Sequence, residues 1–117
     1  MLINISTSKR NQPVVTKLTA KLNGSTKENV IARIALGYSL ASGKRFTKQE
    51  FSSYDSQGKE YKDHILFDPA LKDFYIALVC QAYGISKNDE NIPKYIKLHI
   101  DHGLEKINYL FDNTALN

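Results

Sequence analysis

The sequence predicts a mainly α fold, a compact helical domain with about four main helices and a short N-terminal strand. Apolar residues recur at helical spacing in several segments, and residues typical of helix starts and helix ends flank them. The first residues of the chain instead alternate between apolar and polar, which is typical of a strand. No repeat, low-complexity segment or long linker divides the 117 residues, so residues 1–117 are expected to form a single domain.

The predicted strand covers residues 2–8, where Ile3 and Ile5 alternate with Asn4 and Ser6. A single strand cannot satisfy its own main-chain hydrogen bonds. It must therefore pair with a later strand of the same chain or with the same strand of another subunit. The second arrangement would make the protein an oligomer.

The first helix is predicted to begin at Pro13, because a helix start leaves unpaired the N–H that proline lacks, and to end at Asn23-Gly24. A second helix follows directly. The order strand, helix, helix is that of ribbon-helix-helix DNA-binding proteins, in which β-strands of a dimer enter the major groove. The start of the chain is therefore predicted to be ribbon-helix-helix-like. A helix-turn-helix fits less well, because its second helix must expose a polar face.

The second helix, from Ser25 to Gly43, is predicted to be the centre of the fold. Ser25 and Glu28 have the spacing of a capping box, and Gly43 suits the left-handed residue that follows a helix. Apolar side chains cover nearly the whole circumference, which is typical of a buried helix. We therefore expect the other segments to pack around it, with Tyr38 in the core.

Two further helices are predicted in the second half of the chain. One begins at Asp68, an N-cap residue before a proline, and ends at Gly84; the other covers residues 93–111. Residues 59–67, before these helices, are either an extended stretch or a loop that carries an apolar plug. The apolar stripe of the third helix comprises Leu71, Phe74, Tyr75, Leu78, Val79 and Ala82, and the polar face of the last comprises Lys94, Lys97, Asp101, Glu105 and Asn108.

Basic residues are concentrated in the N-terminal half. Residues 1–50 carry a net charge of +7 and residues 51–117 a net charge of −3, which gives the overall +4. Such an asymmetry favours a polyanionic partner, with DNA ahead of an anionic membrane surface, although a solubilising surface would give the same pattern. Few aromatic residues accompany the lysines, which favours phosphate contacts over base stacking. The candidate DNA contacts are Lys9, Arg10, Lys17 and Lys21, followed in second rank by Lys27, Lys44 and Arg45.

No catalytic set is predicted. His99 and His102 share one helix face, but a metal site would need a third ligand, so we expect His99 at the edge of the core and His102 in solvent. Cys80 lies in an apolar helix segment and is expected to be a small buried residue. His64 stands alone, and no glycine-rich phosphate loop is present. We therefore expect neither an enzyme nor a metal or cofactor.

The location expected from the sequence is the cytoplasm. No apolar run is long enough to span a bilayer, and the first residues do not form a signal peptide. The single cysteine cannot form an intrachain disulfide, which fits a reducing compartment.

Three segments together resemble the DndE family of DNA sulfur modification proteins: residues 28–40 (ENVIARIALGYSL), residues 58–67 (GKEYKDHILF) and residues 98–104 (LHIDHGL). The resemblance extends along essentially the whole chain. It implies a small helical oligomer that binds DNA in the system that replaces a non-bridging phosphate oxygen with sulfur. It also implies association with the other proteins of that system, including a cysteine desulfurase and an iron–sulfur partner.

The expected function is a non-catalytic, DNA-binding accessory component of DNA phosphorothioation. The expected partners are double-stranded DNA, intact or nicked, the other phosphorothioation proteins and further copies of the chain, without a membrane. The alternative is an adaptor that assembles the modification proteins without touching DNA. An autonomous nuclease or sulfur-transfer enzyme would instead depend on Cys80, His99 or His102.

Overall fold

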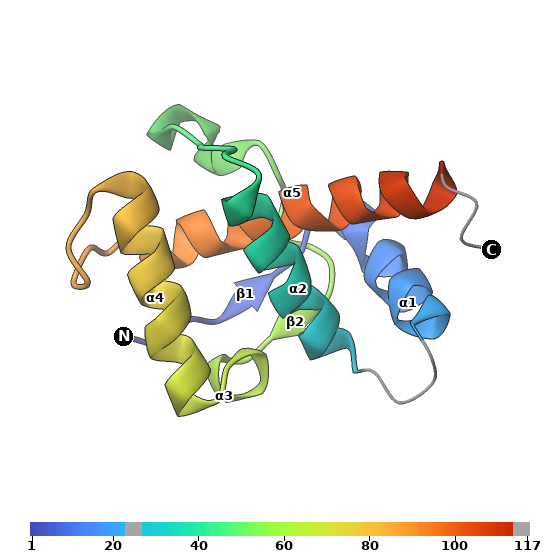
Figure 1. Ribbon diagram of the computed structural model, residues 1–117, viewed down its shortest axis with the longest axis horizontal. Helices are drawn as coiled ribbons and strands as arrows, with labels where there is room; N and C mark the ends of the chain where they lie inside the picture. The colour runs from blue at the N-terminus through green and yellow to red at the C-terminus, as the bar shows by residue number, and fades with distance from the viewer. Residues whose placement is uncertain (23–26, 114–117) are drawn as a thin grey trace.

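A computed structural model describes residues 1–22 and 27–113. The predicted mainly helical fold with a short N-terminal strand is confirmed. Figure 1 shows a long C-terminal helix crossed by the central helix, with the remaining helices at the two sides. In chain order the elements of this described part are β1 (Ile5–Ser6), the 3-10 helix η1 (Lys9–Asn11), α1 (Gln12–Lys21), α2 (Glu28–Ala41), the 3-10 helix η2 (Lys48–Ser52), β2 (Glu60–Tyr61), α3 (Asp63–Leu66), α4 (Pro69–Tyr83) and α5 (Ile92–Asp112).

The crossing of α2 and α5 forms the centre of the core (Figure 1). Gly103 of α5 lies against the main chain of α2, so close that a Cβ atom built on it would be 1.9 Å from the carbonyl oxygen of Ala35. The core around this contact is built from apolar residues of both helices together with residues from β1, β2, α1 and α4. The two helices pack closely because glycine at this position lets their backbones approach.

Helix α2 is central, but it is not buried on every side. Ile34 is 46% exposed and Tyr38 is 40% exposed, so the expectation that Tyr38 lies in the core is wrong. The reason is geometric: α5, α1 and α4 contact α2, and no described element covers its outer face. Gly43 has a φ of 86°, which confirms the left-handed position after the helix.

The beginning of α2 differs from the predicted boundary. The helix starts at Glu28, with Lys27 as its N-cap residue. The predicted capping-box residue Ser25 and the predicted stop at Asn23-Gly24 lie outside the described residues. The Glu28 carboxylate accepts a hydrogen bond from the Thr16 hydroxyl, at 2.9 Å, so this side chain ties α2 to α1.

Strand β1 pairs with β2 of the same chain. The pairing is antiparallel, with Ile5 opposite Tyr61 and Ser6 opposite Glu60. The order strand, helix, helix is as predicted, and of the two possible partners for the strand the structure shows the one within the chain. Residues 59–67, left open by the sequence, contain β2 and α3, and Leu66 and Phe67 form the buried plug.

Helix α4 has the predicted ends. The Asp68 carboxylate accepts the Leu71 N–H at 3.0 Å, and Gly84 has a φ of 64°. The helix lies at the side of the molecule, so most of its predicted apolar stripe is only half buried, and Phe74 is 55% exposed. Cys80 is also half buried, in contrast to the full burial expected.

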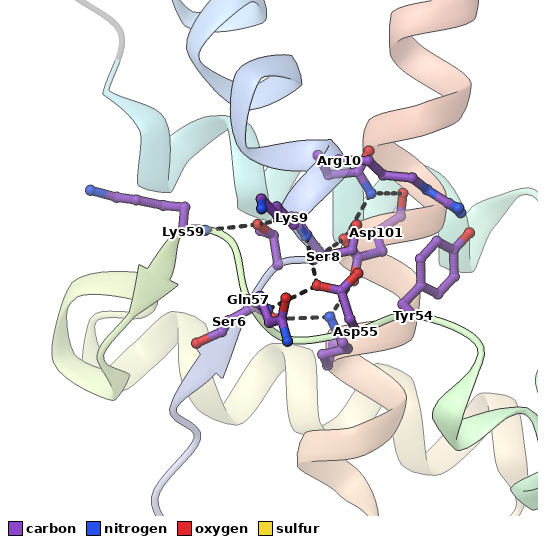
Figure 2. A network of polar contacts seen from close by, with 12 residues as sticks. Ser6, Ser8, Lys9, Arg10, Tyr54, Asp55, Gln57, Lys59 and Asp101 are labelled. Atoms are coloured by element: carbon purple, nitrogen blue, oxygen red, sulfur yellow. Dashed lines mark hydrogen bonds and ion pairs between the residues drawn. The ribbon is translucent and has the colours of Figure 1, made fainter.

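Helix α5 matches its predicted range but not its predicted polar face. Lys97 is 9% exposed, and Asp101 and His99 are fully buried. The N-terminal residues of the chain and η1 lie over this face, as Figure 2 shows for Ser8 beside Asp101. Within the described residues, none of the helices is long and apolar enough to cross a membrane.

Candidate nucleic-acid interface

The segment that carries Lys9 and Arg10 is held by a buried carboxylate (Figure 2). Asp101 Oδ1 accepts the main-chain N–H of Ser8 at 2.9 Å and the side-chain amide of Asn11 at 2.8 Å. These two hydrogen bonds fix both ends of the turn at η1. Since Asp101 is fully buried, each bond forms where water does not compete for the carboxylate.

The charge of Asp101 is matched by Lys97, one helical turn earlier in α5. The Lys97 ammonium contacts Asp101 Oδ2 and also donates to the main-chain carbonyl of Ser6 at 2.8 Å. A buried charge pair contributes little on balance, but removal of one partner leaves an uncompensated buried charge. The pair therefore acts as an anchor that fastens β1 and η1 to α5.

A second carboxylate, at the surface, holds the same segment from the other side. Asp55 Oδ2 accepts the N–H of Lys9 at 2.9 Å and the N–H of Gln57 at 3.0 Å, and these hydrogen bonds lower the pKa of Asp55. Gly58 is required beside this turn, because a Cβ atom there would be 2.3 Å from the carbonyl oxygen of Ser8. Lys9 is thus fixed through its main chain, and its side chain is exposed.

Arg10 has its charge matched within the chain. Its Nε donates to Glu105 Oε2 at 2.6 Å, which raises the pKa of Arg10. Its guanidinium lies over the Tyr54 ring, 5.0 Å from the centroid, and the Tyr54 hydroxyl donates to Glu105 Oε1 at 2.8 Å. Burial raises the pKa of Tyr54, so the phenol remains a donor. Arg10 and Tyr54 thus contact each other and both donate to the Glu105 carboxylate.

Lys17 also forms an ion pair, whereas Lys21 pairs with none of the described residues. The Lys17 ammonium lies 2.7 Å from both Asn108 Oδ1 and Asp112 Oδ1 at the end of α5. Lys21 is exposed, and no ion pair between described residues involves it. The charge asymmetry along the sequence is therefore not a separation in space, because acidic residues of α5 lie beside basic residues of η1 and α1.

The three second-rank candidates are divided between the two ends of α2. Lys27 precedes the helix and lines a pocket of about 560 Å³ together with Lys59 and Lys62. Lys44 and Arg45 follow the other end, where Arg45 donates to the carbonyl oxygens of Leu40 and Ala82. The structure therefore brings the first four candidates onto neighbouring elements and leaves Lys44 and Arg45 apart from them.

Lys59 and Lys62 were not found by the sequence reasoning. Lys59 lies 3.7 Å from the Glu28 carboxylate, and Lys62 lies 3.3 Å from that of Glu60. Both belong to the half of the chain with net negative charge, so a charge count could not indicate them. Their proximity to Lys27 depends on the pairing of β2 with β1.

The two histidines of α5 belong to a buried hydrogen-bond chain. The Tyr83 hydroxyl accepts the N–H of Phe46 at 2.9 Å and is hydrogen-bonded to His99 Nε2 at 2.7 Å. The Ser39 hydroxyl joins the two rings, at 2.6 Å from His99 Nδ1 and 2.7 Å from His102 Nδ1, and the tautomers of the two histidines set which group donates in each bond.

Both histidines are more buried than expected, and both are hydrogen-bonded within the chain. His99 lies in the core instead of at its edge, and the half-buried His102 is bonded to Ser39 instead of being solvated. Burial lowers the pKa of His99 to about 3 and also lowers the pKa of His102. Over the described residues, no group of three or more His, Cys, Asp and Glu side chains is placed to hold a metal ion.

The comparisons with known proteins agree on one family. The family model described as DNA sulphur modification protein DndE matches residues 4–114. Among solved structures, the chain is similar to the crystal structure of DndE from Escherichia coli B7A involved in DNA phosphorothioation modification, with a TM-score of 0.71 and 17% identity over 92% of this chain and 98% of that chain. At this identity the likeness shows a shared fold. No curated protein matches this chain by sequence.

Proposed function

This chain belongs to the DndE family of DNA sulphur modification proteins, and from this premise we propose that it is a non-catalytic accessory component of DNA phosphorothioation that binds duplex DNA. The proposed contacts are to backbone phosphates, which fix position without reading sequence. The proposed location is the cytoplasm, together with the DNA and the other modification proteins.

The observation that carries the DNA-binding proposal is the arrangement of cations on η1 and α1. Lys9 and Lys21 are exposed and take part in no ion pair between described residues. Arg10 and Lys17 lie on the same two elements, and their acidic partners Glu105 and Asp112 are themselves partly exposed. A phosphate can compete for these two cations, because surface ion pairs contribute only about 0–1 kcal/mol.

Nicked duplex is the proposed preferred form of DNA. Replacement of a phosphate oxygen requires an accessible sugar–phosphate backbone, and a nick makes the backbone accessible and easy to deform. The protein would then hold the substrate while other components perform the sulfur chemistry. The full burial of Ser39 supports a non-catalytic role, since the hydroxyl nearest to the two histidines is out of reach of a substrate.

The test is a gel-shift titration of the protein on intact, nicked and single-stranded DNA at several salt concentrations. We expect affinity to fall steeply with salt and the Lys9→Glu/Lys21→Glu variant to bind more weakly, with a salt slope reduced by about 2. The matched control is Lys48→Glu/Lys87→Glu, which makes the same change in net charge at exposed lysines outside η1 and α1; Lys48 begins η2, and Lys87 is in the loop between α4 and α5, at the opposite side of the molecule from α1 (Figure 1). Affinity that does not depend on salt, or an equal loss with the control, would contradict the proposal.

We also propose that the protein self-associates through the outer face of α2 and α4. Ile34, Tyr38 and Phe74 are exposed on this face, and a hollow of about 370 Å³ lies between the two helices. Exposed apolar groups of this kind are typical of interaction sites. We expect Tyr38→Glu to lower the mass in solution, whereas Tyr109→Glu, at an exposed tyrosine of α5, leaves it unchanged. A wild-type protein that is a monomer in light scattering at micromolar concentration would refute self-association.

The adaptor function remains the second candidate, and the ion pairs of Arg10 and Lys17 favour it. With both charges matched by Glu105 and Asp112, the net positive charge of this surface is smaller than the sequence suggests. The two functions are separated by Lys17→Glu/Lys21→Glu. Loss of DNA binding with intact assembly of the modification proteins supports DNA contact, and the reverse pattern supports the adaptor.

A further inference from the structure

One edge of the small sheet is open. Thr7 uses both its N–H and its carbonyl toward the β2 side, bonding Lys59 and Gly58 at 2.9 Å each. Because main-chain groups alternate along a strand, those of Asn4 and Ser6 point to the opposite edge. The Ser6 carbonyl there accepts the Lys97 ammonium at 2.8 Å, which confirms the direction. The Ser6 N–H and the main-chain N–H and carbonyl of Asn4 have no partner among the described residues.

This open edge forms one wall of a pocket of about 480 Å³. The other walls come from η2, with Phe51 and Ser52, and from the first turns of α5, with Pro93 and Lys94. The volume is within the range of about 300–1,000 Å³ that is usual for ligand sites. The pocket thus combines unpaired main-chain donors and an acceptor with an aromatic side chain.

The charge of the pocket is positive. Among the described residues, its lining includes Lys94 and Lys97 and no carboxylate. The charge of Lys97 is matched by Asp101, so Lys94 supplies the free charge. Lys94 is exposed, its ammonium lies 5.3 Å from the centroid of the Phe51 ring, and it forms no ion pair with a described residue.

We propose that this groove binds an extended segment of a partner protein that carries an acidic side chain. The segment would add a strand to the open edge of β1, with hydrogen bonds to the main chain of Asn4 and to the Ser6 N–H. Apolar side chains of the segment would contact Phe51, and the acidic side chain would pair with Lys94. Addition of a strand to an exposed sheet edge is a common mode of peptide recognition.

The chemistry of the groove favours a peptide over DNA. A phosphate backbone only accepts hydrogen bonds, so it would leave the Asn4 carbonyl without a donor, whereas a peptide offers both N–H and carbonyl groups. One free cation also gives a weak phosphate site compared with the cations of η1 and α1. The groove is lined by other residues than Lys9 and Lys21, so this inference stands apart from the proposed DNA binding.

The key variant is Ser6→Pro. Proline lacks the N–H that faces the groove, and it is tolerated on an edge strand when that N–H is not used within the sheet. Ser6→Ala is the matched control because it keeps the N–H. Lys94→Glu tests the charge, and Lys9→Glu/Lys21→Glu tests independence from DNA binding.

The probe is a fluorescent synthetic pentapeptide, Val-Glu-Val-Glu-Val with blocked ends, and the readouts are anisotropy and amide chemical shifts of the full chain. We expect the peptide to shift the amide signals of Asn4, Ser6 and Lys94. Binding should weaken about tenfold in Ser6→Pro, the equivalent of about 1.4 kcal/mol, and stay within about twofold in Ser6→Ala and in Lys9→Glu/Lys21→Glu. In Lys94→Glu the preference should reverse toward the Val-Lys-Val-Lys-Val peptide.

Three results would overturn the inference. The first is no binding of the acidic peptide at millimolar concentration. The second is equal binding by Ser6→Pro and Ser6→Ala when both variants keep the wild-type helical signal. The third is a shift of the same amide signals by duplex DNA or inorganic phosphate alone, which would make the groove an anion site.

Discussion

Gly103 of α5 lies directly against the main chain of Ala35 in α2, with no room for a side chain between the two helices. A Cβ atom at Gly103 would come within 1.9 Å of the Ala35 carbonyl oxygen. The contact sets the distance between the two helices that form the centre of the core, so it also places Asp101 and the turn that carries Lys9 and Arg10.

The substitution Gly103→Ala is therefore expected to separate α2 from α5. We expect a loss of about 3 kcal/mol or more in the free energy of unfolding, measured by urea denaturation, because neither backbone can move without disturbing the core. The control is Gly37→Ala in α2, where the nearest atom is the Tyr75 hydroxyl at 4.0 Å. There alanine should stabilise the helix by about 0.5–1 kcal/mol. Equal changes in unfolding free energy for Gly103→Ala and Gly37→Ala would show that α2 and α5 leave room for a methyl group where they cross.

The anchor formed by Asp101 and Lys97 gives a second prediction. Asp101→Asn keeps an oxygen that can accept the Ser8 N–H but removes the charge that matches Lys97, so we expect a loss of about 3–5 kcal/mol in unfolding free energy. Faster amide hydrogen exchange at Ser8 and Asn11 should accompany it. Asp73→Asn, at an exposed position of α4, should change stability by less than about 0.5 kcal/mol. A loss of unfolding free energy no larger than that of Asp73→Asn would contradict this prediction. It would mean that water compensates the charge of the Lys97 ammonium.

Release of Arg10 from its ion pair should strengthen DNA binding. Glu105→Gln removes the charge that the Arg10 guanidinium contacts at 2.6 Å, and the freed cation can bind a phosphate. Since an exposed ion pair contributes up to about 1 kcal/mol, we expect an increase in affinity of up to about fivefold, with a steeper salt dependence. Asp73→Asn makes the same change in net charge at another site. If both variants gain equally in gel-shift titrations, only net charge matters and Arg10 is not a contact.

The buried His99 predicts a loss of stability in acid. Its pKa falls from 6.5 to about 3 in the folded protein, so below pH 6.5 the unfolded chain binds a proton that the folded chain does not. As the pH is lowered from roughly 6 to 4, the unfolding free energy should therefore fall by about 1.4 kcal/mol per pH unit. It should return to its original value when the pH is raised again. His99→Gln should reduce this slope by about 1.4 kcal/mol per pH unit, because the unfolded variant binds one proton fewer. The prediction is contradicted if the unfolding free energies of the wild type and of His99→Gln change equally with pH over this range.

The elements themselves could be predicted because their signals are local. Asp68 and Gly84 mark the ends of α4, and Gly43 follows α2, since each acts on the hydrogen bonds of its own turn. The partner of β1 could not be predicted, because two residues of β2 in an ambiguous stretch give no periodicity. The failure to place Tyr38 and Phe74 has a related cause: an apolar pattern shows which residues favour burial, not whether a neighbour in the same chain covers them.

For the candidate DNA contacts, too, some features follow from local sequence and others depend on the packing of the fold. The order of residues already shows a basic N-terminal segment, and the spacing of Lys17 and Lys21 places both on one face of α1. The pairing of Arg10 with Glu105 and of Lys17 with Asp112, each across 95 residues of sequence, depends on how the helices pack in the folded chain. The physical reason is that Coulomb interactions depend on distance in space, whereas a charge count along the chain contains no information about which acidic residues the fold brings to the basic ones.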